Sequence, residues 1–133
     1  MFSHIFTSVT DFERALTFYT AVMQALGLEQ RFCDRERPWA GWHSAQKNRP
    51  FFVICTPNDQ QPHHPGNGQM VAFAADTRAV VRAVHAAALA QGGVCAGLPG
   101  LRAQYHPHYY GAYFRDPDGN KLAVACHADE SRL

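Results

Sequence analysis

The chain has 133 residues, of which 47% are hydrophobic and 17% are charged, and its formal net charge at pH 7 is +1. A chain of this length fits one domain that buries a core, and the composition is that of a folded protein. The nearly balanced charge, with Lys and Arg scattered along the chain, disfavours nucleic acids and acidic membranes as partners.

The first predicted elements are a short strand at residues 4–8 and a helix that ends at Gly27. Thr10 and Glu13 have the spacing of a capping box, in which each residue satisfies a backbone donor of the first helical turn. Apolar residues then recur at three- and four-residue steps, which predicts one buried helix face. They are Phe12, Ala15, Leu16, Tyr19, Val22, Met23 and Leu26.

The next elements are strands. Residues 41–43 begin one strand, a polar link follows at 44–50, and residues 52–55 form an apolar strand. The stretch 58–68 is rich in Pro and Gly, so we expect it to be a linker.

The second half repeats this order. A strand at 70–74 precedes Asp76, the expected N-cap of a helix that ends at Gly92-Gly93. Residues 111–113 begin a strand that corresponds to 41–43, and the Asp-Pro-Asp-Gly turn at 116–119 leads to residues 122–125, which correspond to 52–55 at an offset of 70. The prediction is an α+β fold of two βαβββ modules, about 1–57 and 69–127, within one domain spanning 1–133.

The location is predicted from what the sequence lacks. No apolar run approaches the roughly 20 residues that span a bilayer, and the first residues do not resemble a signal peptide. The four cysteines form no CxxC pair. We therefore expect a cytoplasmic protein with reduced thiols.

Several motifs together resemble the vicinal oxygen chelate superfamily, which includes glyoxalases, bleomycin-resistance proteins and extradiol dioxygenases. They are His4-Ile5, Phe18-Tyr19, Leu-Gly-Leu at 26–28 and Asp-Pro-Asp-Gly-Asn-Lys at 116–121, while residues 100–105 and 109–110 look like the glyoxalase-like branch. The resemblance covers about residues 2–127. It implies paired βαβββ modules, often dimeric, whose curved mixed sheet surrounds a cup-shaped pocket with the helices outside.

The resemblance also implies where metal-dependent members hold a divalent ion. One ligand lies on the opening strand and one on the closing strand of each half, and these positions fall on His4, Val53, Met70 and Ala123. Only His4 offers a donor suited to such an ion. No metal cofactor is therefore predicted, with a divalent metal as the alternative. If the register were shifted by one residue, Gln69 would occupy the ligand position instead of Met70. The side chains of Val71 and Phe73 would then point into the cup.

The expected ligand-binding residues lie on strands and in the polar, aromatic run at 102–110. Arg102 suits a carboxylate or phosphate, and tyrosines offer flat apolar surface with a hydroxyl tip. In the alternative interpretation, the residues of this run only cover the rim of the cup or form a dimer contact. Trp42 is likewise buried without a ligand-binding role in its alternative interpretation. No catalytic residue is assigned, and an unconventional metal site among His63, His64, His106, His108 and His127 stays open. The predicted ligand-binding set is His4, Phe6, Trp42, His43, Met70, Arg102, Tyr105, His106 and Tyr110.

Three functions follow from these observations. The first is a homodimeric protein that binds a small organic molecule without the family metal. The second is a glyoxalase-like lyase or isomerase, or a dioxygenase, that uses a metal or a His/Tyr proton-transfer pair. The third is a structural subunit whose cup is filled by its own side chains.

Overall fold

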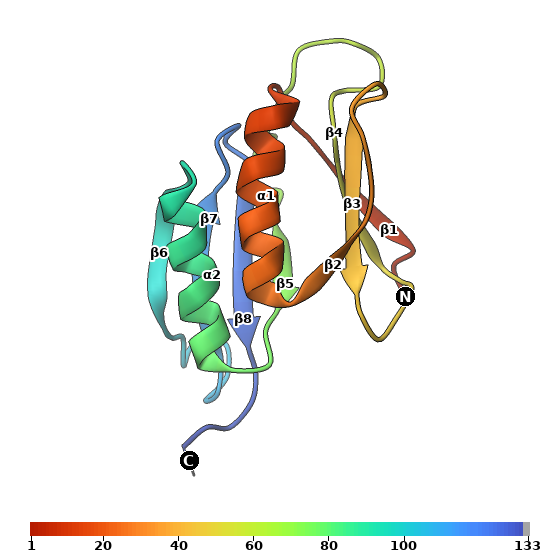
Figure 1. Ribbon diagram of the computed structural model, residues 1–133. Helices are drawn as coiled ribbons and strands as arrows, with labels where there is room; N and C mark the ends of the chain where they lie inside the picture. The colour runs from red at the N-terminus through yellow and green to blue at the C-terminus, as the bar shows by residue number, and fades with distance from the viewer. Residues whose placement is uncertain (132–133) are drawn as a thin grey trace.

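The computed structural model describes residues 1–131, and each half of the chain folds as a strand, a helix and three strands (Figure 1). The first module contains β1 (His4–Ser8), α1 (Phe12–Leu26), β2 (Leu28–Asp34), β3 (Trp39–Ser44) and β4 (Phe51–Cys55). The second contains β5 (Val71–Ala74), α2 (Arg78–Ala90), β6 (Val94–Leu101), β7 (Tyr110–Arg115) and β8 (Lys121–Cys126). Within the described part of the chain, no helix has the length and apolarity needed to cross a membrane.

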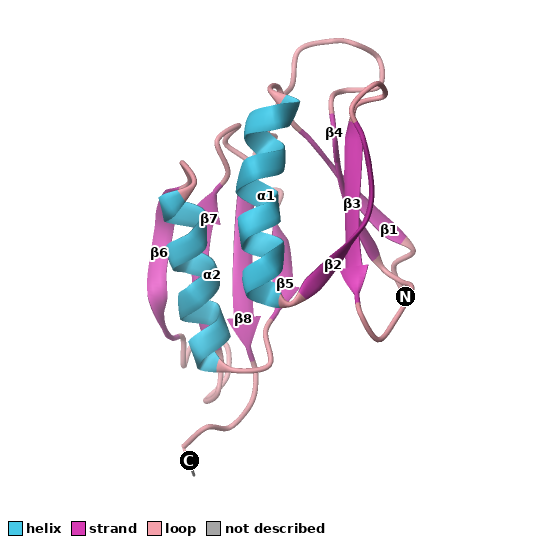
Figure 2. Cartoon of the chain, viewed as in Figure 1, coloured by secondary structure: helices cyan, strands magenta, loops and turns pink. Residues whose placement is uncertain are grey.

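The strands form two four-stranded mixed sheets, ordered β1-β4-β3-β2 and β5-β8-β7-β6 (Figure 2). In each sheet the opening strand pairs in parallel with the closing strand, and the remaining pairs are antiparallel. The predicted α+β fold of two βαβββ modules is confirmed. The eight strands remain two sheets, however, and do not close into a single continuous one.

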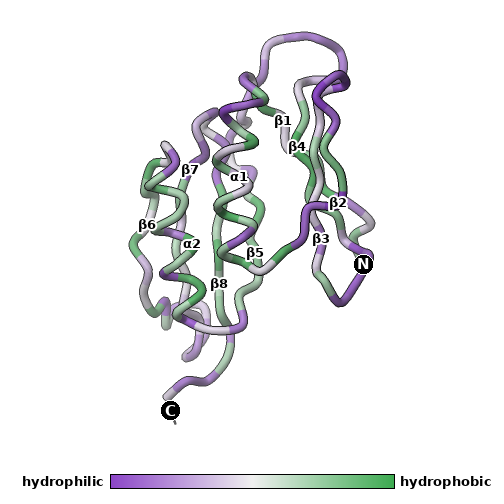
Figure 3. The backbone as a smooth tube through the Cα atoms, in the orientation of Figure 1, coloured by the Kyte–Doolittle hydropathy of each residue, from purple (hydrophilic) through white to green (hydrophobic). Residues whose placement is uncertain are grey.

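The hydrophobic core lies between the helices and one face of each sheet. The two helices pack against each other, and α2 also packs on β6, β7 and β8. Along β8, Leu122 and Val124 point into this core, and the hydropathy-coloured tube is largely hydrophobic there (Figure 3). Because side chains alternate along a strand, the residues between them face the other way. We call that opposite face of each sheet the cup face.

Side chains at the junction of the modules hold them together. The buried Tyr19 hydroxyl on α1 donates to Asp116 Oδ2 at 2.6 Å, in the turn between β7 and β8. Asn120 in the same turn donates to the Ser8 carbonyl oxygen at 2.9 Å. The Asp-Pro-Asp-Gly turn therefore binds module 1 as well as reversing the chain.

Both helices begin one residue later than the sequence suggested. Asp11, not Thr10, caps α1 by accepting a hydrogen bond from the Arg14 backbone N–H at 3.1 Å. Thr77, not Asp76, caps α2. The Thr10 backbone N–H instead donates to Asp118 Oδ1 in the distant turn. This tertiary contact is invisible in local spacing.

The sheet register confirms one part of the predicted repeat and corrects another. Ile5 lies opposite Phe52 and Val71 opposite Leu122, so β4 and β8 do correspond at an offset of 70. Gly41, however, lies opposite Val53, whereas Ala123 lies opposite Tyr113 rather than Gly111. The β7–β8 hairpin is two residues shorter than the β3–β4 hairpin, so the structural counterpart of Gly41 is Tyr113.

Candidate functional site

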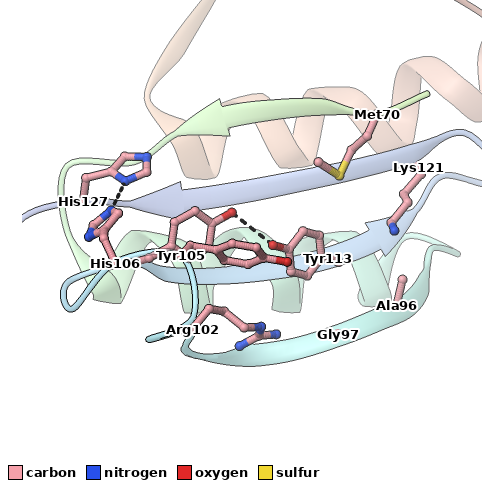
Figure 4. A pocket seen from close by; sticks show the side chains of 10 residues that line it. Met70, Ala96, Gly97, Arg102, Tyr105, His106, Tyr113, Lys121 and His127 are labelled. Carbon is pink, nitrogen blue, oxygen red and sulfur yellow. Dashed lines mark hydrogen bonds between the residues drawn. The ribbon is translucent and has the colours of Figure 1, made fainter. Parts of the chain in front are cut away.

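A cavity of about 700 Å³ lies on the cup face of the second sheet (Figure 4). Its walls come from the residue before β5, from strands β6, β7 and β8, from the residue after β8 and from the segment between β6 and β7. We call it the tyrosine cavity. Its lining residues are Met70, Ala96, Gly97, Arg102, Tyr105, His106, Tyr109, Tyr113, Lys121 and His127.

Strand alternation places the floor of the tyrosine cavity. Tyr113 on β7 pairs with Ala123 on β8, and both point away from the helices because their neighbours Phe114 and Val124 are in the core. Lys121 shares their face, two residues before Ala123, and its Nζ lies 5.6 Å from the Tyr113 ring centroid. A small residue at 123 leaves the space beside this ring open.

Arg102 is held in position by backbone carbonyl oxygens of β6. Its Nη1 donates to the Gly100 carbonyl oxygen at 3.0 Å and its Nη2 to the Leu98 carbonyl oxygen at 2.8 Å. Its guanidinium carbon lies 5.4 Å from the Tyr113 ring centroid. Among residues 1–131, neither Arg102 nor Lys121 forms a salt bridge. Two cations therefore flank one tyrosine without an acidic partner.

Three tyrosines line one side of the cavity. The Tyr105 and Tyr109 rings lie 4.9 Å apart, and the Tyr109 and Tyr113 hydroxyls are 3.1 Å apart, within hydrogen-bond distance. A Cβ at Gly111 would lie 2.8 Å from Tyr109 Cε1, so the missing side chain is what lets this ring lie close over β7. Burial, followed by the hydrogen bond with Tyr109, raises the pKa of Tyr113. Tyr113 is therefore a neutral hydroxyl at pH 7.

Two histidines meet at one end of the cavity, as Figure 4 shows. His106 Nδ1 accepts the backbone N–H of His108 at 3.1 Å, so a neutral His106 carries its proton on Nε2. That Nε2 lies 2.8 Å from His127 Nδ1 and can donate to it. The arrangement orders the two rings, with their centroids 5.1 Å apart.

The structure brings part of the predicted ligand-binding set together. Met70, Arg102, Tyr105 and His106 all line the tyrosine cavity. Met70 also lines a smaller pocket of about 280 Å³, together with Phe6 of β1.

His4 and His43 do not reach the tyrosine cavity. The exposed His4 packs edge-on against Phe6, with ring centroids 5.5 Å apart. The His43 ring stacks on Phe51 at 5.6 Å, and its Nδ1 bonds to carbonyl oxygens of the adjacent turn.

Two residues of the predicted set lie on the other side of their strands. Trp42 is 2% exposed and belongs to the core, where its ring lies near Tyr19. Tyr110 packs against that core and accepts a hydrogen bond from Arg82 of α2 at 3.3 Å. Trp42 therefore has the buried position of the alternative interpretation, and the expected position of Tyr110 in the cup is corrected. Each lies three residues from a side chain on the cup face, Trp42 from Trp39 and Tyr110 from Tyr113, so it points the other way.

Four further residues that line the cavity were not predicted from the sequence to bind a ligand: Tyr109, Tyr113, Lys121 and His127. Strand alternation from the buried Val124 would have pointed to Lys121 on β8 and, once the hairpin register was known, to Tyr113 on β7. Tyr109 lies in the polar, aromatic run at 102–110, but the contact with Gly111 that positions its ring is not visible in the sequence.

The four positions that the family resemblance assigns to a metal do not fit a divalent ion. Val71 and Phe73 pack on the core, so the register that places Met70 on the cup face is confirmed. The positions then carry one imidazole, one thioether and two alkyl groups at His4, Met70, Val53 and Ala123. These offer a single nitrogen donor and no carboxylate, which does not offset the desolvation of Mg²⁺, Ni²⁺ or Zn²⁺.

The other histidines bind protein groups. His63 Nδ1 lies 2.6 Å from Ser8 Oγ, and its Nε2 lies 3.2 Å from the Asp118 carbonyl oxygen. His64 Nδ1 accepts the Gly66 backbone N–H at 3.0 Å. Across the described residues, no three His, Cys, Asp or Glu side chains are grouped in a way that would hold a metal ion.

Comparison with known proteins places the chain among its relatives. Residues 1–124 match the family model described as the Glyoxalase/Bleomycin resistance protein/Dioxygenase superfamily. The chain belongs to this superfamily. A comparison with curated proteins gave no match.

Solved structures of the same superfamily share the fold. A glyoxalase/bleomycin resistance protein from Albidiferax ferrireducens T118 is 36% identical, with a TM-score of 0.84, and the match covers 94% of this chain and 98% of that one. A glyoxalase/bleomycin resistance protein/dioxygenase family enzyme from Burkholderia phytofirmans PsJN is 18% identical, with a TM-score of 0.69, and the match covers 95% of this chain and 98% of that one. A glyoxalase-related enzyme from Fulvimarina pelagi is 16% identical, with a TM-score of 0.70 and coverage of 95% and 87%.

Proposed function

We propose that this superfamily member binds a small organic molecule in the tyrosine cavity and does so without the family metal. The cavity itself carries the proposal. Its volume of about 700 Å³ falls in the range of small-molecule sites, roughly 300–1,000 Å³. Its walls combine aromatic surface with a few polar groups, the usual composition of such sites. A subunit with a filled cup would leave no such space.

A homodimer forms part of this proposal. Phe6 is 52% exposed and Met70 45% exposed on the cup faces, and Leu98 and Leu101 of β6 are 70% and 53% exposed. A second copy that covers these side chains would remove apolar surface from water. Light scattering coupled to size-exclusion chromatography measures the mass directly, and a monomer at micromolar concentration would contradict this part.

A cytoplasmic location is also proposed. Cys33, Cys55, Cys95 and Cys126 are all free thiols, which fits a reducing compartment. Localisation of a fluorescent fusion tests this part, and a fusion recovered outside the cytoplasm would contradict it.

A ligand screen with a cavity-blocking variant tests the binding proposal. Ala96 lines the cavity, so Ala96→Trp should fill it, whereas Val94→Trp places the same ring at an exposed position of the same strand outside the lining. We expect fragments that raise the melting temperature of wild-type protein to raise that of Val94→Trp but not of Ala96→Trp. Hits that stabilise all three proteins equally would contradict the site.

Elemental analysis tests the metal part of the proposal. Protein prepared without a histidine tag is expected to hold no stoichiometric divalent ion. One ion per chain that resists weak chelators and is lost in a His4→Ala variant would overturn this part.

A second candidate is a lyase or isomerase that moves a proton. The observation that favours it is the ordered pair of His106 and His127, because imidazole is the side chain best suited to proton transfer near neutral pH. Turnover of a glutathione hemithioacetal, lost in a folded His106→Asn variant, would favour the enzyme. No turnover, together with reversible ligand binding, would favour the binding protein.

A further inference from the structure

We propose that the ligand of the tyrosine cavity is an anionic aromatic molecule. Its carboxylate, sulfonate or phosphate group is held by Arg102 and Lys121, and its ring lies against the tyrosines. This inference rests on the proposed binding function and adds the charge and chemical class of the ligand.

The lining carries positive charge without negative charge. Its ten residues include Arg102 and Lys121 but no Asp or Glu. Arg14, by contrast, does meet an acid, with Asp118 at 2.9 Å. A cavity with two cations and no acid attracts anions and repels amines.

The geometry of Arg102 suits an oxyanion. A guanidinium has five N–H donors, and two of them are engaged by the carbonyl oxygens of Leu98 and Gly100. These bonds fix the plane of the group before any ligand binds, so less side-chain entropy is lost on binding. The remaining donors have no acidic partner among residues 1–131.

The positions of the cations relative to Tyr113 suit an aromatic acid. The Arg102 guanidinium and the Lys121 ammonium lie 5.4 Å and 5.6 Å from the centroid of this one ring. Beside it, Tyr105 is 61% exposed and offers ring surface for stacking, with Tyr109 behind it. A short aliphatic acid would leave that surface bare, whereas an aromatic acid uses both features.

Two dyes that share one ring system test this inference. 8-Anilinonaphthalene-1-sulfonate and N-phenyl-1-naphthylamine differ by the sulfonate group, so their difference in affinity measures the contribution of the charge. We expect wild-type protein to bind the sulfonate at least about tenfold more tightly by calorimetric titration. We also expect this preference to shrink as salt rises, because exposed charges are screened.

Charge-removing variants locate the effect. Arg102→Gln and Lys121→Gln should each weaken sulfonate binding by about tenfold and leave the neutral dye within about twofold. Arg31→Gln on β2 and Lys47→Gln in the β3–β4 turn are the matched controls, since both side chains are exposed and lie outside the lining. If Arg102→Gln lowers the melting temperature, the role of the charge is judged from two other variants. Lys121→Gln should then weaken sulfonate binding, and the charge-preserving Arg102→Lys should retain it.

The outcomes separate this inference from the proposal beneath it. Equal affinity for both dyes, unchanged in the two variants but abolished in Ala96→Trp, overturns the anion and leaves the binding site standing. Dye binding that persists in Ala96→Trp, or no binding of either dye, overturns both. A sulfonate preference that depends on Arg102 and Lys121 and vanishes in Ala96→Trp supports both.

Discussion

The cup face of the first sheet is covered by its own aromatic rings, whereas that of the second sheet is open and basic. On the first sheet, Trp39 packs between Phe6 and Phe32, with centroids 6.3 Å and 4.7 Å away, and the guanidinium of Arg37 lies over it at 3.6 Å. On the second, tyrosines and two cations that form no salt bridge within residues 1–131 surround a cavity. One backbone plan therefore supports two different surfaces.

The difference comes from where each sheet leaves a gap. On β3 the gap is Gly41, where a Cβ would lie 2.5 Å from the Phe32 ring. On β7 the gap is Gly111, whose register counterpart is Trp39, and the bulky residue is Tyr113. The glycine and the aromatic residue have thus exchanged places between β3 and β7, so different parts of the two cup faces are filled by side chains. The apolar positions maintain the repeat while the cup-facing positions diverge.

The helices differ in a similar way. Each carries one buried polar side chain at the same place relative to its N-cap, Tyr19 in α1 and His85 in α2. Tyr19 donates to the carboxylate of Asp116, whereas His85 Nε2 lies 3.2 Å from the Cys95 sulfur. The first is a charge-assisted bond between modules, and the second is a weak contact within one module.

The largest effect is expected from the two tryptophans of β3, which lie on opposite faces. Trp42→Ala should lower the free energy of unfolding by about 3–5 kcal/mol, because Trp42 is 2% exposed in the core. Trp39→Ala, on the cup face, should cost about 1 kcal/mol. Urea denaturation followed by far-UV circular dichroism measures both. Equal losses would contradict the assignment of Trp42 to the core.

The bond between the modules gives the next largest effect. Tyr19→Phe removes a buried hydroxyl that donates to Asp116 and should destabilise the protein by about 2 kcal/mol in the same assay. Tyr110→Phe is the matched control and should cost under about 0.5 kcal/mol, because the one hydrogen bond of its hydroxyl within the described residues is a 3.3 Å contact with Arg82. If Tyr19→Phe costs no more than its control, the contact with Asp116 is not stabilising.

Alkaline pH probes the same bond. Burial, followed by the neighbouring Asp116 carboxylate, raises the pKa of Tyr19 well above its ordinary value near 10. A folded-state pKa above the unfolded value means that the stability contributed by the protonated Tyr19 hydroxyl is present below pH 10 and is lost as the pH rises further. The free energy of unfolding should therefore fall above pH 10 more steeply for wild type than for Tyr19→Phe. Parallel pH curves would argue against the raised pKa.

The smallest effect is expected at His85. Burial lowers the pKa of this imidazole below its ordinary value of 6.5. A lowered folded-state pKa means that the unfolded chain binds the proton more readily, so stability is complete above pH 6.5 and declines below it. His85→Gln should flatten the decline measured between pH 7 and pH 5, whereas His64→Gln on the exposed linker should not. If the free energy of unfolding declines as steeply in His85→Gln as in wild type, the lowered pKa of His85 is contradicted.

Much of the fold was predictable because apolar periodicity is a local property. Three- and four-residue spacing gave both helices, and the order of elements gave the two modules. The site was harder. Met70 was selected from its place on an opening strand, and Arg102, Tyr105 and His106 by residue type. All four reach the cavity. Trp42 was selected from its strand and Tyr110 by residue type. Both face the helices, because neither criterion reveals which way a strand side chain points.

By itself, the sequence determined the superfamily, the repeated strand–helix–strand order and the shortage of metal donors, since His4 alone of His4, Val53, Met70 and Ala123 offers one. Each of these depends on residue identity and local pattern alone. Only the tertiary structure decided which cap holds each helix, which glycine faces Val53 and which cations share Tyr113. Those choices depend on hairpin length and on contacts between distant segments, which no local pattern encodes.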